Sequence, residues 1–140
     1  MPYGYGVWLK INNPFIKNIT SHIAHATIMC NMTREEASKL KKKLKTKYDI
    51  EINGHCKPIG EKYDKDDDLK SCGVSCKIED WESIKEKCSG FSGSIPENPH
   101  ITFQYFDVFE KNFPFLSDTG DVVVADIKST NPLEWKIIEN

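Results

Sequence analysis

Apolar and polar residues alternate along several stretches of the chain at the period of a β-strand. In residues 5–11, one face would carry Tyr5, Val7, Leu9 and Ile11. The opposite face would carry Gly6, Trp8 and Lys10, with Trp8 directed at either solvent or a ligand. The same alternation predicts further strands over residues 23–30, 48–53, 71–78, 121–128 and 133–138, and an edge strand containing Pro58 over residues 55–60.

Helical spacing and capping signals predict two helices between these strands. Thr33 followed by Glu36 forms a capping box, and the apolar residues after it recur every three or four positions, so we expect a helix over residues 33–47. Its lysines 41–43 fit a solvated face, with phosphate binding as the alternative. Asp80 is expected to cap a second, shorter helix that places Trp81, Ile84 and Cys88 on one side.

Three segments have weaker patterns. Residues 15–21 are interpreted as a loop or short turn after the Asn12-Asn13-Pro14 break, and residues 107–116 as a short helix or turn. Residues 89–99 are rich in glycine, serine and proline and form a candidate mobile rim of an active site. The acidic loop 64–68 lacks the ligand spacing and glycine of a calcium loop.

The order of elements predicts one α+β domain over residues 1–140, with two lobes that each hold an antiparallel sheet backed by a helix. A formal net charge of −2 gives no sign of a protein that coats nucleic acid or a membrane surface. Arg34 is the one arginine, so phosphate or base recognition would use lysine point charges. No apolar run is long enough to span a bilayer, and no secretion signal is recognisable.

The cysteines number five, an odd count that favours free thiols in a reducing, cytoplasmic compartment. Cys72 and Cys76 are spaced as metal ligands sometimes are. On a strand, however, residues four apart lie about 13 Å from each other, too far to share one zinc ion. We therefore expect buried thiols, and we expect neither a metal nor another cofactor.

Two stretches repeat one pattern, His25-Ala26-Thr27-Ile28 and His100-Ile101-Thr102-Phe103. Each lies in a predicted strand, where the histidine and threonine share one face and the apolar residues enter a core. A single His-x-Thr motif is most simply explained as two residues of an ordinary strand. Two such motifs, which use half of the 4 histidines, are less easily explained by chance. The other two histidines, His22 and His55, are expected at the surface or behind the site.

Paired imidazoles suit cleavage of a phosphodiester. One neutral histidine can take a proton from the attacking oxygen, while a protonated histidine on the other side of phosphorus gives one to the leaving oxygen. The threonine hydroxyls can donate to the non-bridging oxygens, where charge builds up. No metal is then required. The pattern leaves open which of His25 and His100 is the acid and which the base.

On these motifs the chain resembles the 2H phosphoesterase superfamily, the LigT-like phosphodiesterases, which carry two His-x-(Ser/Thr) motifs. The order of elements agrees along nearly the whole chain, although longer members place a helix where residues 15–21 lie. The resemblance implies a bilobal fold with two antiparallel sheets around a central cleft. It also implies metal-independent cleavage of phosphodiesters, with His25 and His100 as acid and base and Thr27 and Thr102 binding the phosphate.

The small size and the Lys-, Ile- and Asn-rich composition are similar to compact viral and phage members of the superfamily. This likeness implies a monomer in the host cytosol that hydrolyses cyclic dinucleotide messengers such as cGAMP and so evades immune signalling. No stable nucleic-acid complex is expected. The alternatives are opening of 2′,3′-cyclic phosphates on RNA ends, cleavage of 2′-5′ oligoadenylates, and a non-catalytic nucleotide- or RNA-binding module. Aromatic side chains would stack on the bases, and the candidates are Tyr5, Trp8, Phe106 and Trp135.

Overall fold

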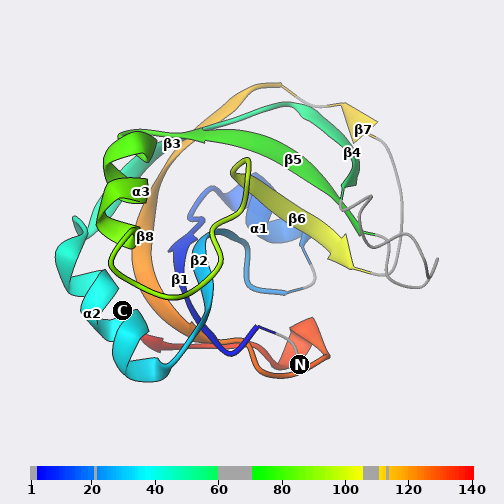
Figure 1. Cartoon of the computed structure of the whole chain (residues 1–140). Helices are drawn as coiled ribbons and strands as arrows, with labels where there is room; N and C mark the ends of the chain where they lie inside the picture. The colour runs from blue at the N-terminus through cyan, green and yellow to red at the C-terminus, as the bar shows by residue number, and fades with distance from the viewer. Residues whose placement is uncertain (1–2, 21, 60–70, 106–110, 113) are drawn as a thin grey trace.

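The structure is a computed structural model, and it describes residues 3–20, 22–59, 71–105, 111–112 and 114–140. Strands dominate, with three helices and a short 3-10 turn, η3, among the described residues (Figure 1). In chain order the elements are β1 (Tyr5–Lys10), α1 (Pro14–Ile19), β2 (His25–Met32), α2 (Arg34–Lys43), β3 (Lys47–Ile52), β4 (His55–Ile59), β5 (Ser71–Ile78), α3 (Trp81–Cys88), β6 (His100–Tyr105), β7 (Lys111–Asn112), β8 (Leu116–Asp126), η3 (Pro132–Glu134) and β9 (Lys136–Glu139).

The strands join into one antiparallel sheet that closes on itself. Its order is β3-β8-β1-β2-β6-β5, and β5 pairs again with β3, so these six strands form a ring. β4 and β9 attach outside the ring, to β5 and β8, and β7 extends β4. The mixed α and β content agrees with the sequence prediction, whereas the expected division into two separate sheets does not.

The sheet is continuous because β8 is long enough to pair with two different strands. This strand has 11 residues, and it pairs with β1 along Asp121–Asp126 and with β3 along Leu116–Asp121. β8 thus connects β1 and β3 within the ring. Alternation in the sequence predicted only residues 121–128. The polar first half of β8, which includes Ser117 and Thr119, carries too few apolar residues to be read as a strand.

The predicted alternation of faces holds on the strands that surround the main core. Val7 and Leu9 of β1, Ala26 and Ile28 of β2, and Ile101 of β6 are all fully buried in one cluster to which all six ring strands contribute. Helices α2 and α3 add Ala37, Leu40 and Ile84 to the same cluster. The opposite faces of β1 and β8 form a smaller second cluster around Trp8 and Trp135.

Residues 14–19 form a helix, so the interpretation of this segment as a loop or turn was wrong. Pro14 occupies the first turn, where its missing N–H costs nothing, and the Asn13 side chain accepts hydrogen bonds from the backbone of Phe15 and Ile16. The Asn-Pro pair that ends β1 is therefore also a helix start. Only Ile16 of this short helix is buried, too little to create a visible periodicity.

The two longer helices begin where the sequence predicted. The capping box of Thr33 and Glu36 is present, but α2 ends at Lys43, because Leu44 is extended and Tyr48 belongs to β3. Asp80 precedes α3 but does not cap it. Its backbone is left-handed, with φ of 60°, and its carboxylate forms an ion pair with Lys45 at 2.9 Å.

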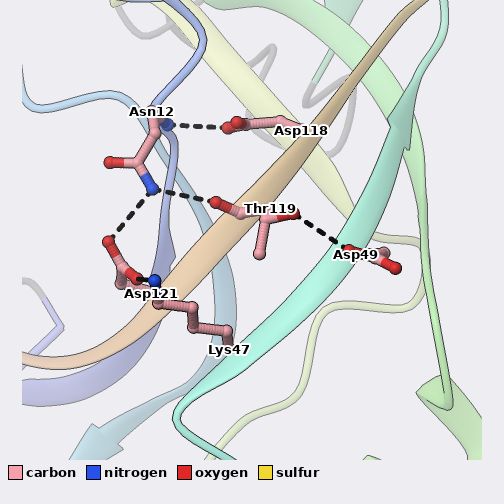
Figure 2. A network of polar contacts seen from close by, with 6 residues as sticks. All are labelled: Asn12, Lys47, Asp49, Asp118, Thr119 and Asp121. Atoms are coloured by element: carbon pink, nitrogen blue, oxygen red, sulfur yellow. Dashed lines mark hydrogen bonds and ion pairs between the residues drawn. The ribbon is translucent and has the colours of Figure 1, made fainter.

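The loop between β1 and α1 is fastened to β8 by a polar network (Figure 2). One carboxylate oxygen of Asp118 accepts the backbone N–H groups of Asn12 and Asn13, at 2.6 and 3.1 Å. The Asn12 amide donates to Asp121 and to the carbonyl of Thr119, and the Thr119 hydroxyl donates to Asp49 on β3. This network fixes the start of the segment that leads to His22 and β2.

The remaining expectations are met in part. Cys30, Cys76 and Cys88 are free thiols, and Cys72, Cys76 and Cys88 are buried, as predicted for structural thiols. Residues 133–138 were expected to be a strand, but Pro132 opens a turn of 3-10 helix before β9. Residues 107–116 were expected to form a short helix or turn, but Lys111–Asn112 form β7 and Leu116 begins β8. Residues 107–110 and 113, and all of the 64–68 loop, lie outside the described residues. No helix among the described segments is long and apolar enough to cross a membrane.

Candidate active site

The two His-x-Thr motifs lie on neighbouring strands, β2 and β6, which run antiparallel with Ala26 opposite Ile101. In that register His25 lies across from Thr102, and Thr27 lies across from His100. Ala26 and Ile101 are fully buried in the main core, so the four polar residues share the other face of the sheet. The two histidines are diagonal neighbours, whose Cα atoms are typically about 7–8 Å apart.

Each histidine makes the same local hydrogen bond. Nδ1 of His25 lies 2.7 Å from the carbonyl oxygen of Ile23, and Nδ1 of His100 lies 3.0 Å from that of Asn98. A carbonyl only accepts, so Nδ1 must be the protonated nitrogen in both rings. Nε2 is then the nitrogen that exchanges a proton with a ligand. The two motifs therefore present their imidazoles in the same tautomer.

The other polar atoms of the motifs make no hydrogen bond with a described residue. This holds for Nε2 of both histidines and for the hydroxyls of Thr27 and Thr102. Thr102 itself is buried, and Thr27 is half-buried.

His25 lies deeper than His100. It is 5% exposed, while His100 is half-buried. Burial lowers the pKa of His25 to about 3, outweighing the opposite effect of its hydrogen bond to Ile23, and the neighbouring His22 and His100 lower it further. At neutral pH the imidazole of His25 is therefore uncharged. It can accept a proton but has none to donate from Nε2.

His22 belongs to the same group of rings, although the sequence gave it no partner pattern. It is 9% exposed, its ring centroid lies 5.7 Å from that of His25, and it contacts the backbone of Thr102 in the second motif. Burial lowers the pKa of His22 to about 4, so it too is neutral. His22 precedes β2, where alternation carries no information, and no signal in the sequence would have found it.

The predicted base-stacking residues are placed unevenly. Trp8 and Trp135 lie beside His25, but they are only 1% and 7% exposed, so neither offers an open ring face. Trp8 therefore faces neither solvent nor an open ligand site. Tyr5 is half-buried, and its hydroxyl accepts a hydrogen bond from Lys128. Phe106 lies outside the described residues. Stacking on a base stays a prediction for Tyr5 and Phe106, whereas the burial of Trp8 and Trp135 leaves no ring face open to a base.

A lysine that the sequence did not single out lies next to the first motif. Lys10 is directly opposite His25 in the register of β1 and β2, and residues paired in this way point to the same face. It forms no ion pair or hydrogen bond with a described residue and is half-buried. Lys10 is therefore a cation on the same face as the first motif, with Asp121 of β8 as its pairing partner on the other side.

The second motif depends on Gly73 of β5, which pairs with Thr102. A Cβ atom at this position would lie 2.1 Å from the carbonyl oxygen of Ile101 and 2.9 Å from Cα of Thr102. Only glycine allows this approach of the two strands. Nothing in the sequence marked this glycine, because the close contact is between strands far apart in the chain.

The loop predicted to be a mobile rim is anchored at its middle. Ser94 exchanges two backbone hydrogen bonds with Cys30 of β2, at 2.8 and 2.9 Å, and its hydroxyl accepts one from Asn31. His55 is exposed, as expected, and its Nδ1 contacts Asn112 of β7. Among the described residues, no three metal-ligating side chains are grouped together.

The chain was compared with protein-family models, curated proteins and solved structures, and no match was found in any of the three. The site therefore has to be interpreted from its own residues and geometry.

Proposed function

We propose that the protein is a phosphodiesterase that uses His25 and His100 as general base and general acid, in the manner of the 2H phosphoesterases that its motifs resemble. The observation that supports this most strongly is the pairing of Ala26 with Ile101, which sets both motifs side by side on one face. The identical anchoring of Nδ1 leaves Nε2 of both rings for proton transfer. Two such nitrogens on neighbouring strands can act on the two sides of one phosphorus atom, as acid–base catalysis of an in-line displacement does.

The difference in burial supports a division of roles. Because burial lowers the pKa of His25 to about 3, its ring is uncharged at neutral pH and cannot be the proton donor, so the acid is then His100. A water molecule attacks phosphorus as His25 takes its proton, and the bond to the leaving ribose oxygen breaks as His100 protonates that oxygen. Thr27 and Thr102 donate to the non-bridging oxygens.

The proposed substrate is a ribonucleotide phosphodiester, with cyclic dinucleotides such as cGAMP as the leading candidates. The resemblance to compact viral members of the superfamily supports this choice. The alternatives within the enzyme class are 2′,3′-cyclic phosphates on RNA ends and 2′-5′ oligoadenylates. Lys10 would offset the negative charge of any of these phosphates, which is why the charge of the site does not discriminate among them.

A substrate panel tests the proposal. The protein is incubated with EDTA and with cGAMP isomers, 2′-5′ oligoadenylates or 2′,3′-cyclic mononucleotides, and the products are separated by chromatography. We expect turnover of at least one substrate in EDTA and a loss of about 10²- to 10⁴-fold in either His25→Gln or His100→Gln. His55→Gln is the matched control, because His55 is exposed and hydrogen-bonded to Asn112. No turnover of any member of the panel would refute the enzyme.

The burial of His25 favours one second candidate, a nucleotide-binding module without catalysis. A ring that is 5% exposed gives a ligand little access to its Nε2. In that case a nucleotide would raise the melting temperature of the protein without being consumed. The double variant His25→Ala and His100→Ala would then bind as tightly as the original protein.

A further inference from the structure

Trp8 covers His25 face to face. The centroids of the two rings are 3.6 Å apart, and their planes differ by 11°. Trp8 lies on β1 diagonally across from His25, and its own pairing partner is Thr27. Its indole N–H has no hydrogen-bond partner among the described residues, so packing rather than a hydrogen bond holds the ring in place.

This contact matters for the chemistry of a buried base. When His25 accepts a proton it becomes an imidazolium, which burial destabilises because little water reaches the ring. A cation placed over the face of an aromatic ring is attracted by the negative potential of that face, and indole gives the strongest attraction among the natural side chains. The ring that excludes water from His25 is thus also the best available partner for its charged form.

We propose that Trp8 stabilises the protonated form of His25 through the stacked indole face, and so acts through His25 on the proposed reaction. Trp8 is then a positioning residue and does not touch the substrate. This inference rests on the proposed function for its effect on turnover, but the attraction between the two rings does not depend on turnover.

The surroundings make the indole the main source of stabilisation. Trp135 lies with its centroid 6.1 Å from His25, at 67° to its plane, and its N–H donates to the carbonyl of Ser129. The charged groups that act on His25 are His22 and His100, and both lower its proton affinity. Its pairing partner on β1 is the cation Lys10. The carboxylate in the same register is Asp121 of β8, which lies one strand further away and accepts a hydrogen bond from Asn12. β8 adds the apolar Val123 and Ala125 to the cluster that contains Trp8.

The test weakens the indole face without changing its size. Tryptophan with one, two or three ring fluorines is incorporated at position 8, because fluorine withdraws charge from the face of the ring while the shape is kept. The matched control places the same residues at Trp81, which is half-buried in α3 against the main core. Melting temperatures establish that each protein folds.

Two measurements are made on each protein. We expect kcat to fall stepwise with each fluorine at position 8, by about tenfold in total, with KM nearly constant and with no trend at position 81. By NMR, the ring signals of His25 should report protonation at lower pH in the fluorinated proteins than in the original. The second measurement needs no substrate.

The outcomes separate this inference from the proposed function. A shift of the His25 titration without any turnover in the whole series would support the stacking proposal and refute the enzyme. An unchanged His25 titration, compared in proteins that stay folded throughout it, would overturn the stacking proposal, whatever the effect on turnover. A similar fall in kcat at positions 8 and 81 would overturn it as well.

Discussion

The two His-x-Thr motifs have the same local structure but lie at different depths. In both, the imidazole is anchored through Nδ1 to the carbonyl two residues earlier, and the following apolar residue is buried. His25 is stacked on Trp8 and 5% exposed, whereas His100 is half-buried. The comparison teaches that one short sequence pattern can place two imidazoles at different depths, so that the surrounding residues and not the motif set the proton affinity of His25.

The largest expected effect comes from removing either ring. If His25 is the base and His100 the acid, His25→Gln should abolish the acid limb of the pH profile of kcat/KM, and His100→Gln should abolish the alkaline limb. Each variant should lose about 10²- to 10⁴-fold in activity. The profiles are measured on the best substrate of the panel. Loss of the same limb in both variants would contradict the division of roles.

The second effect is a loss of stability where β5 packs against the second motif. Gly73→Ala places a Cβ against the carbonyl of Ile101, so β5 must move away from β6, and we expect a loss of about 3 kcal/mol in the free energy of unfolding. Gly90→Ala is the control, because a Cβ there meets nothing within 4 Å. Urea titration measures both. Equal stability of the two variants would mean that β5 and β6 are not closely apposed at Thr102.

The third effect concerns the two buried histidines, His22 and His25. The pKa values of His22 and His25 are lowered from 6.5 to about 4 and about 3, so the unfolded chain binds protons more readily than the folded protein. Stability is therefore fully present above pH 6.5 and is lost as the pH falls toward the folded values. We expect about 1.4 kcal/mol per pH unit for each histidine, measured by urea unfolding between pH 7.5 and 5.

Single replacements show whether this loss comes from the two buried histidines. His22→Gln and His25→Gln should each remove about half of the pH dependence of stability. A pH dependence that neither replacement changes would contradict the burial of these two rings.

The smallest effect tests the charge beside the first motif. Lys10→Met keeps the length of the side chain but removes the ammonium opposite His25, so KM for a phosphodiester should rise by about five- to tenfold while kcat changes less. The exposed Lys77 provides the control replacement, Lys77→Met. The gain in KM should shrink at high salt, which screens the same interaction. An unchanged KM would show that Lys10 does not contribute to binding the phosphodiester.

Much of this molecule could be read from local patterns. Alternation placed β1, β2, β3 and β5 within a few residues, and the capping box of Thr33 and Glu36 placed the start of α2. Residues 15–21 and the first half of β8 were missed, since a short helix with one buried side chain and a polar strand show no clear period. The same limit applies to the site, where the motif residues were found and His22, Lys10 and Gly73 were not.

By itself, the sequence determined which side chains share a face, because the period of a strand is a property of the backbone and needs no partner. It put His25 with Thr27, and His100 with Thr102, on the polar face of their strands. Only the tertiary structure decided that β2 and β6 are neighbours, that Trp8 lies flat on His25, and that one histidine is deeper than the other. Proton affinity follows from burial and from nearby charges, and both arise from contacts between residues far apart in the chain.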